Sequence, residues 1–131
     1  MKKGMMIPAL LLGLASTPAP AQDGILSLLG TWTGDRDRIA KVEGRRGGMA
    51  TLVITEQEGR TFVGKLKRSN ASGDEEEPLW GAFTPDAKLM IGADEEGTYL
   101  FTLIDINTLD YCYSESGPSP RAVCAQLTRQ P

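Results

Sequence analysis

The sequence predicts an all-β protein, folded as an antiparallel up-and-down barrel of about eight strands. Apolar and polar residues alternate along a series of short runs, and a period of two is the pattern of a half-buried strand. Clusters of Gly, Pro and Asp separate these runs by short connections, as in a meander of hairpins. Beyond the first 21 residues, no segment shows the three-to-four-residue apolar spacing of a helix.

The first 21 residues have the layout of a secretory signal peptide. Lys2 and Lys3 give a basic start, residues 5–15 are almost entirely apolar, and Ala19-Pro20-Ala21 is a small-x-small cleavage site. The apolar run is shorter than the roughly 20 residues that cross a bilayer. We therefore expect residues 1–21 to be removed and residues 22–131 to form one domain, periplasmic or secreted, without membrane insertion.

The expected strands follow one another at short intervals. The runs that alternate are residues 30–34, 49–55, 62–67, 79–83, 89–91, 99–104, 109–114 and 123–128. Residues 37–43 are only weakly apolar, and the count of about eight includes them as a strand. Turns are expected at residues 45–48, 56–59, 85–86, 94–97, 105–107 and 117–120, because these hold the Gly, Pro, Asn and Asp that tight bends require.

Residues 69–77 are the one segment of low complexity, with small polar residues followed by a run of acids. We expect a solvated loop there. A calcium site is the alternative, but four adjacent acids do not space oxygen ligands around a glycine turn.

Two glycines lie inside expected strands, each between large residues on the inward face. These are Gly64 and Gly81. Glycine within a strand marks strong bending or the close approach of another group. We expect close packing, because a small barrel is filled by its own side chains. The alternative is a ligand lying on the bare backbone.

The two cysteines predict a disulfide bond. If Cys112 lies opposite Cys124 in a final hairpin, both point away from the face that holds Tyr111 and Val123. In an exported protein, two such thiols form a bridge. Closing a loop of about 13 residues stabilises the fold by about 3 kcal/mol.

Composition excludes several functions. The chain has no His and a net charge of −3, so we expect no metal, no cofactor, no nucleic-acid partner and no enzymatic activity. Four arginines lie close together in sequence and are suited to an anion: Arg36, Arg38, Arg45 and Arg46. Acidic residues interleave with them, so we expect a mixed, solvated surface.

The pattern Gly30-Thr31-Trp32 in the first strand, with Arg129 late in the last, resembles the calycin superfamily. This group includes lipocalins, fatty-acid-binding proteins, avidins and small bacterial metalloprotease inhibitors. The resemblance implies that Trp32 plugs one barrel end and that Arg129 packs across its ring, a cation–π contact worth about 0.5–2 kcal/mol. In the inhibitors a short arm, here residues 22–27, enters the protease, although their disulfide lies earlier in the chain.

We expect a binding module rather than an enzyme, with a protein partner or a small apolar ligand. Protein recognition would use loops, the N-terminal arm or Trp80, which is exposed in one strand register and part of the core in the other. An apolar ligand would lie in the barrel mouth, near Phe62, Phe83, Phe101 and Tyr111. Inhibition of a secreted metalloprotease is a special case of protein recognition.

Overall fold

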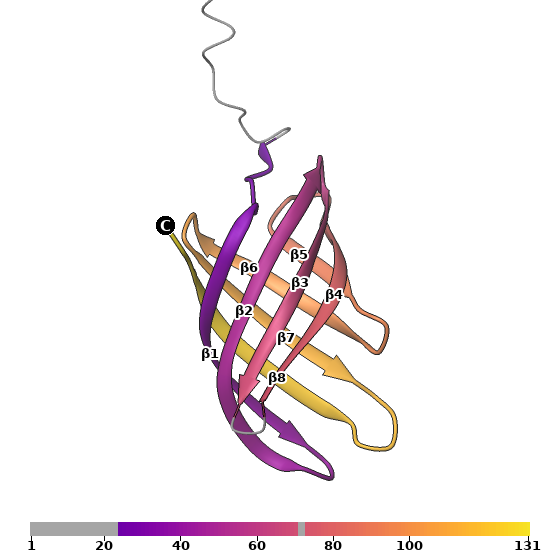
Figure 1. Ribbon diagram of the computed structural model, residues 1–131. Coiled ribbons are helices and arrows are strands. Elements are labelled where there is room, and N and C mark those ends of the chain that lie inside the picture. The colour runs from indigo at the N-terminus through magenta and orange to yellow at the C-terminus, as the bar shows by residue number, and fades with distance from the viewer. Residues whose placement is uncertain (1–23, 71–72) are drawn as a thin grey trace, which may run out of the picture.

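Eight antiparallel strands form a closed barrel (Figure 1), which confirms the predicted fold class. The computed structural model describes residues 24–70 and 73–131, so the predicted signal peptide lies outside the described residues. Each strand pairs with the next along the chain, and β1 pairs with β8 to close the barrel. The strands are β1 (Gly30–Ala40), β2 (Gly44–Glu58), β3 (Thr61–Asn70), β4 (Gly73–Phe83), β5 (Leu89–Ala93), β6 (Gly97–Asp105), β7 (Thr108–Glu115) and β8 (Arg121–Arg129).

The first hairpin, formed by β1 and β2, is longer than the sequence pattern predicts. Residues 37–40 continue β1 instead of forming a separate strand, and residues 41–43 make the turn. Residues 45–48, predicted as a turn, lie within β2 and pair with residues 36–39. The physical reason lies at Gly48, where φ is +144° and a Cβ would come 2.2 Å from the carbonyl oxygen of Ser69. This glycine therefore serves a close approach of β2 to β3 rather than a tight bend.

The prediction of a loop at residues 69–77 is also wrong for most of that segment. β3 extends to Asn70 and β4 begins at Gly73, while residues 71–72 lie outside the described part of the chain. Opposite charges face each other across the two strands: Arg68 pairs with Glu75 at 3.0 Å, and Lys65 lies 3.9 Å from Glu76. Cross-strand pairs of this kind favour strand pairing, so the acidic run is part of the sheet.

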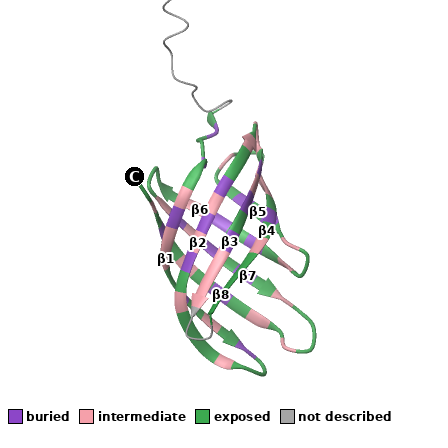
Figure 2. Cartoon of the chain, viewed as in Figure 1, coloured by how far each residue is buried: buried purple, intermediate pink, exposed green. Residues whose placement is uncertain are grey.

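The interior is apolar along most of the barrel. Each strand has buried residues on its inward face, and these alternate with more exposed ones (Figure 2), as the period of two requires. The largest fully buried side chains are Trp32, Tyr111, Phe101, Ile25, Leu28, Leu52, Leu79, Met90, Leu109 and Leu127.

The segment before β1 closes one end of the barrel. Residues 24–29, here called the N-terminal plug, bury Ile25 and Leu28 in the core. The amide of Leu28 donates to Gln57 Oε1 at 2.7 Å, and Trp32 Nε1 donates to the Leu28 carbonyl at 3.0 Å. The plug is therefore held by polar contacts as well as by burial.

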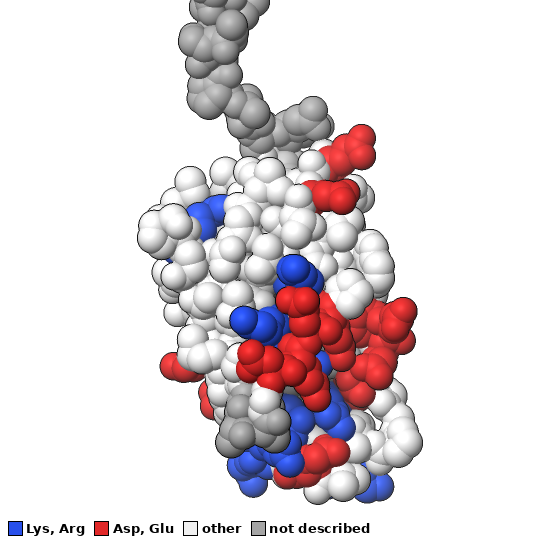
Figure 3. Space-filling view, in the orientation of Figure 1, with Lys and Arg blue, Asp and Glu red and all other residues white. Residues whose placement is uncertain are grey.

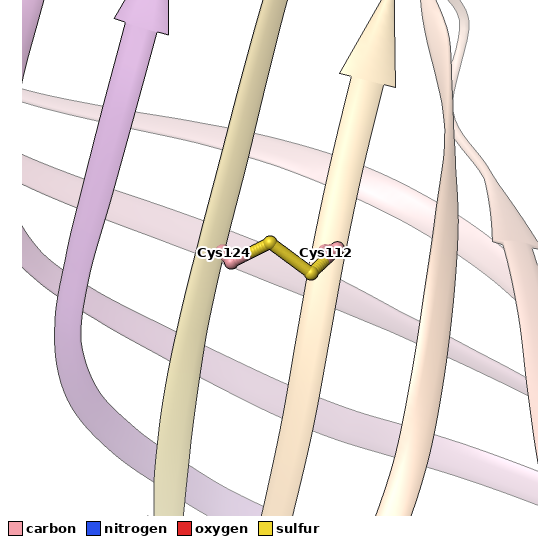
Figure 4. The surroundings of a disulfide bond; sticks show 2 residues. All are labelled: Cys112 and Cys124. Carbon is pink, nitrogen blue, oxygen red and sulfur yellow. A yellow bond between two sulfur atoms is a disulfide. The ribbon is translucent and has the colours of Figure 1, made fainter.

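A disulfide bond joins Cys112 of β7 to Cys124 of β8, as predicted (Figure 4). The two residues are directly paired, and their side chains are exposed on the outside of the barrel. The bond is consistent with an oxidising compartment. In the part of the chain that the structure describes, no helix has the length and apolar character to cross a membrane.

Candidate functional site

Trp32 and Arg129 are in contact at the plugged end. The Arg129 guanidinium carbon lies 4.2 Å from the centroid of the Trp32 ring, and the two residues pair between β1 and β8. Arg129 also donates hydrogen bonds to three carbonyl oxygens, those of Ser27 and Leu29 at 3.0 Å and that of Ile106 at 3.2 Å. This arginine therefore ties the N-terminal plug to the last strand.

Four aromatic side chains considered for an apolar ligand are buried against one another. The rings of Phe62 and Phe83 are 6.2 Å apart, those of Phe62 and Phe101 are 6.0 Å apart, and those of Phe101 and Tyr111 are 6.3 Å apart. The Phe62 ring also covers Gly81, where a Cβ would lie 2.2 Å from its Cζ. A side chain of the protein thus occupies the space above that glycine.

Trp80 lies on the outside of the barrel and is 49% exposed. Ile91 of β5 and Leu100 of β6 are directly paired and also exposed, and the register places Trp80 opposite Ala93 at the end of β5. Together these residues form an uncharged apolar area on the outer surface of β4, β5 and β6.

The other end of the barrel is lined with arginines. Trp32, Arg36 and Arg38 share one face of β1, and that face points inward, so Arg36 is only 3% exposed. The intervening Asp35 and Asp37 point outward. The expectation of a mixed, solvated surface is therefore wrong for Arg36, because the strand sends its cations and its carboxylates to opposite sides.

These arginines surround a cavity of about 190 Å³, here called the arginine pocket. Its lining comes from β1, β2, β3, β4, β8 and the first turn: Arg36, Arg38, Glu43, Arg46, Arg68, Glu75, Arg121 and Val123. Five cations and two carboxylates thus meet in one small space. Figure 3 shows charged side chains crowded over the lower half of the barrel, where the hairpin of β1 and β2 lies.

Ion pairs neutralise only part of this positive charge. Arg68 contacts Glu75 at 3.0 Å and Glu77 at 2.8 Å, while Arg121 contacts Glu43 at 3.0 Å. Among the described residues, no ion pair within 4.0 Å includes the other three arginines of the pocket, Arg36, Arg38 and Arg46. Burial lowers the pKa of Arg38, and the nearby Arg121, Arg46 and Arg36 lower it further. With five arginines and two carboxylates in its lining, the pocket has an excess of positive charge.

Buried hydrogen-bond donors at this end lack acceptors. Within residues 24–70 and 73–131, the buried side-chain atoms without a partner are Arg36 Nε, Arg38 Nε and Nη2, Arg68 Nε and the Tyr111 hydroxyl. Native proteins satisfy the large majority of such groups, so several in one place indicate a missing acceptor.

Three tyrosines lie near this end, and two of them have carboxylate acceptors. Tyr99 donates to Asp94 Oδ2 at 3.2 Å, and Tyr113 donates to Glu115 Oε1 at 2.7 Å. Among the described residues Tyr111 has none, and burial raises its pKa to about 12, so its hydroxyl stays protonated at neutral pH. Tyr111 itself does not line the arginine pocket.

Small residues make room beside Arg36. The register places Tyr111 opposite Ala125, Ala125 opposite Arg36, and Arg36 opposite Gly48, so the four form one row across β7, β8, β1 and β2. A Cβ on Gly48 would lie 3.5 Å from Arg36 Nη2. The two small residues flank the arginine on both sides, and their lack of bulk leaves space around the guanidinium.

The arrangement is suited to binding an anion. It offers hydrogen-bond donors and positive charge in one partly enclosed space. Within the described residues, no group of three or more His, Cys, Asp or Glu side chains is placed to hold a metal ion.

Comparisons with known proteins bear on the fold. A solved structure described as a redesigned β-barrel is similar to this chain, with a TM-score of 0.55 and 14% sequence identity over 79% of this chain and 92% of that one. At this identity the similarity shows a small barrel fold and nothing about function. No protein-family model and no curated protein matches the chain.

Proposed function

We propose that this chain is a non-catalytic binding module that acts outside the cytoplasm and holds a negatively charged ligand in the arginine pocket. The observation that carries the proposal is Arg36, which is 3% exposed, lines the pocket and has an Nε atom without an acceptor among the residues that the structure describes. A buried cation without a counter-ion is costly, and a bound anion would remove that cost.

The other uses suggested by the sequence have weaker support. An apolar ligand would have to separate Phe62, Phe83 and Phe101, which already bury one another. Insertion of an N-terminal arm into a protease would require the plug to leave the core, where Ile25 and Leu28 are buried. The Trp32–Arg129 contact supports the resemblance to calycins, many of which bind ligands.

The test is to follow the Nε–H resonances of the arginines by NMR while adding acetate, citrate, sulfate and phosphate. We expect saturable shifts at Arg36 and Arg38 with anions and none with glycerol, a neutral compound of similar size. Arg45 and Arg60 are the internal controls, because neither lines the arginine pocket. The absence of saturable shifts at Arg36 and Arg38 with every anion would overturn the proposal.

A second candidate function is recognition of a protein through the outer surface of β4, β5 and β6. Exposed Trp80, Ile91 and Leu100 favour it, because tryptophan and aliphatic residues are common anchors at interfaces. A photo-reactive residue at position 80, used in the source cells, should trap one specific protein. The same probe at Lys67, on a charged area of the surface, should trap none; equal trapping at both positions would count against a specific interface.

A further inference from the structure

We infer that the group held in the arginine pocket is a tetrahedral oxyanion with two negative charges, of the phosphate or sulfate class, rather than a single carboxylate. This inference rests on the proposed function and specifies its ligand. Charge, donor directions and size each contribute to it.

The unpaired positive charge exceeds what one carboxylate would neutralise. Arg68 and Arg121 have carboxylate partners within the protein, but Arg36, Arg38 and Arg46 have none within 4.0 Å among the described residues. A singly charged ligand would leave two of these three cations uncompensated in a partly enclosed space. A doubly charged ligand leaves only one of the three cations uncompensated. That cation can be Arg46, because Arg46 is exposed to water.

The free donors come from different sides of the barrel. Of the unpartnered donors that line the pocket, Arg36 and Arg38 belong to β1 and Arg68 to β3. A carboxylate presents two oxygens in one plane, which suits a single guanidinium. A phosphate or sulfate group presents oxygens in tetrahedral directions, so it can accept from guanidiniums on both strands at once.

The size of the cavity sets an upper limit on the ligand. At about 30 Å³ per water molecule in the liquid, 190 Å³ holds about six waters. Pockets for drug-sized molecules start at about 300 Å³. The arginine pocket therefore accepts a free oxyanion or the anionic end of a longer molecule, but not a large ligand in full.

The rim of the pocket explains why the protein does not satisfy these donors itself. Glu43 accepts from Ser119 Oγ at 3.0 Å and from Arg121 Nη2 at 3.0 Å, which engages the same carboxylate oxygen. Glu75 is held by Arg68. One oxygen of each carboxylate is thus engaged by these partners, and among the described residues neither carboxylate lies within 4.0 Å of a guanidinium nitrogen of Arg36 or Arg38.

The experiment is isothermal titration calorimetry on the purified, disulfide-bonded protein in a low-chloride buffer at pH 7.5. The probes are sodium sulfate, inorganic phosphate, methyl phosphate, acetate and nitrate. We expect sulfate and phosphate to bind at least about tenfold more tightly than acetate or nitrate, which is the effect of one additional charged hydrogen bond. Equal affinity for methyl phosphate and phosphate would indicate that the natural ligand is the terminal group of a longer molecule. Clearly weaker binding of methyl phosphate would indicate that it is a free ion. Both results support the inference.

A change of pH tests the charge requirement directly. Methyl phosphate loses its second charge below a pKa of about 6, whereas sulfate keeps both charges. At pH 5.0 we expect methyl phosphate to bind about tenfold more weakly relative to sulfate. Because sulfate meets the same protein groups, including the carboxylates Glu43 and Glu75, it corrects for any effect of pH on the protein itself. An unchanged ratio would overturn the requirement for two charges.

Variants locate the binding. Arg36→Met keeps the aliphatic stem and should weaken sulfate binding by about 10- to 100-fold, while Arg38→Met, at a less buried lining position, should weaken it by about 5- to 20-fold. Arg45→Met, at an outward-facing position of β2, should change it by less than about twofold. If Arg36→Met does not fold, as judged by its melting curve, Arg38→Met decides alone.

The outcomes separate the two proposals. Acetate binding as tightly as sulfate, with dependence on Arg36, would overturn the ligand class and leave the proposed function standing. Equal losses in Arg45→Met and Arg36→Met would show adsorption to surface charge and overturn both. If no anion gives a heat of binding in the calorimeter and the Arg36 and Arg38 resonances do not shift in the NMR titration, both the ligand class and the proposed function are overturned.

Discussion

Replacing Arg129 with Met should destabilise the barrel more than the loss of an ordinary partly exposed arginine. The side chain covers the Trp32 ring at 4.2 Å and donates to three carbonyl oxygens. The cation–π contact contributes about 0.5–2 kcal/mol. The three hydrogen bonds add about 0.5 kcal/mol each, since the freed carbonyls can bind water. We therefore expect the free energy of unfolding to fall by about 2–3.5 kcal/mol.

Thermal unfolding measures this loss. For a domain of this size, 1 kcal/mol corresponds to about 4 °C in Tm, so the variant should melt about 8–14 °C lower. Because Arg129 also binds the carbonyls of Ser27 and Leu29, the N-terminal plug should become more sensitive to limited proteolysis in the variant.

Arg60→Met is the matched control. Arg60 Nη1 donates to the carbonyls of Thr84 and Pro85 at 3.2 and 3.1 Å, and its other structural contacts include no such ring stacking. It should lower Tm by about 4 °C, in line with two ordinary hydrogen bonds. An equal fall in both variants would refute the argument that the indole contact and the plug depend on Arg129.

Three other outcomes are expected. Gly81→Ala should destabilise the fold by about 1–3 kcal/mol in urea unfolding, because the new methyl group collides with the Phe62 ring; Gly47→Ala, whose Cβ would meet only the Arg36 carbonyl at 3.4 Å, should cost clearly less. Replacing both Cys112 and Cys124 with Ala should lower the free energy of unfolding by about 3 kcal/mol, and a thiol reagent should find no free thiol in the unreduced protein. Burial alone would raise the pKa of Asp94, but the amides of Glu96 and Gly97 donate to its carboxylate and hold that pKa below its usual value. As the pH falls, the unfolded chain therefore binds the proton first, so the stability that ionised Asp94 contributes should be lost below about pH 4. Asp94→Asn should flatten that part of the curve of stability against pH.

The alternation of the sequence predicts the fold well because every strand has one buried face. In the final hairpin, the alternation places Cys112 and Cys124 on the outward face, and the direct pairing assumed for them is confirmed. The same rule applied to β1 would have placed Arg36 and Arg38 beside Trp32, on the inside. Taken together as four neighbours in the sequence, the arginines mix residues from both faces of their strands, and this mixture conceals the pocket.

The remaining errors come from residue types that normally break strands. Gly47 and Gly48 have the composition of a turn, but the strand uses Gly48 for a close approach to Ser69. The acidic run in residues 73–77 has the composition of a loop, but its partner strand supplies Lys65 and Arg68. The close approach at Gly48 and the ion pairs of the acidic run both depend on the neighbouring strand. The local sequence of each segment contains no information about that neighbour.

The contact between the first and the last strand has a consequence for how the chain matures. Trp32 pairs with Arg129, and the amide of Gln130 donates to the Thr31 carbonyl at 2.8 Å, so the seam joins residues almost a hundred positions apart. During synthesis, β1 can pair with β8 only after nearly the whole polypeptide has been made. Pairings between residues so far apart in sequence also form slowly. An incomplete chain therefore leaves β1 as an open edge, and we expect truncation after β7 to produce an aggregating product rather than a smaller barrel.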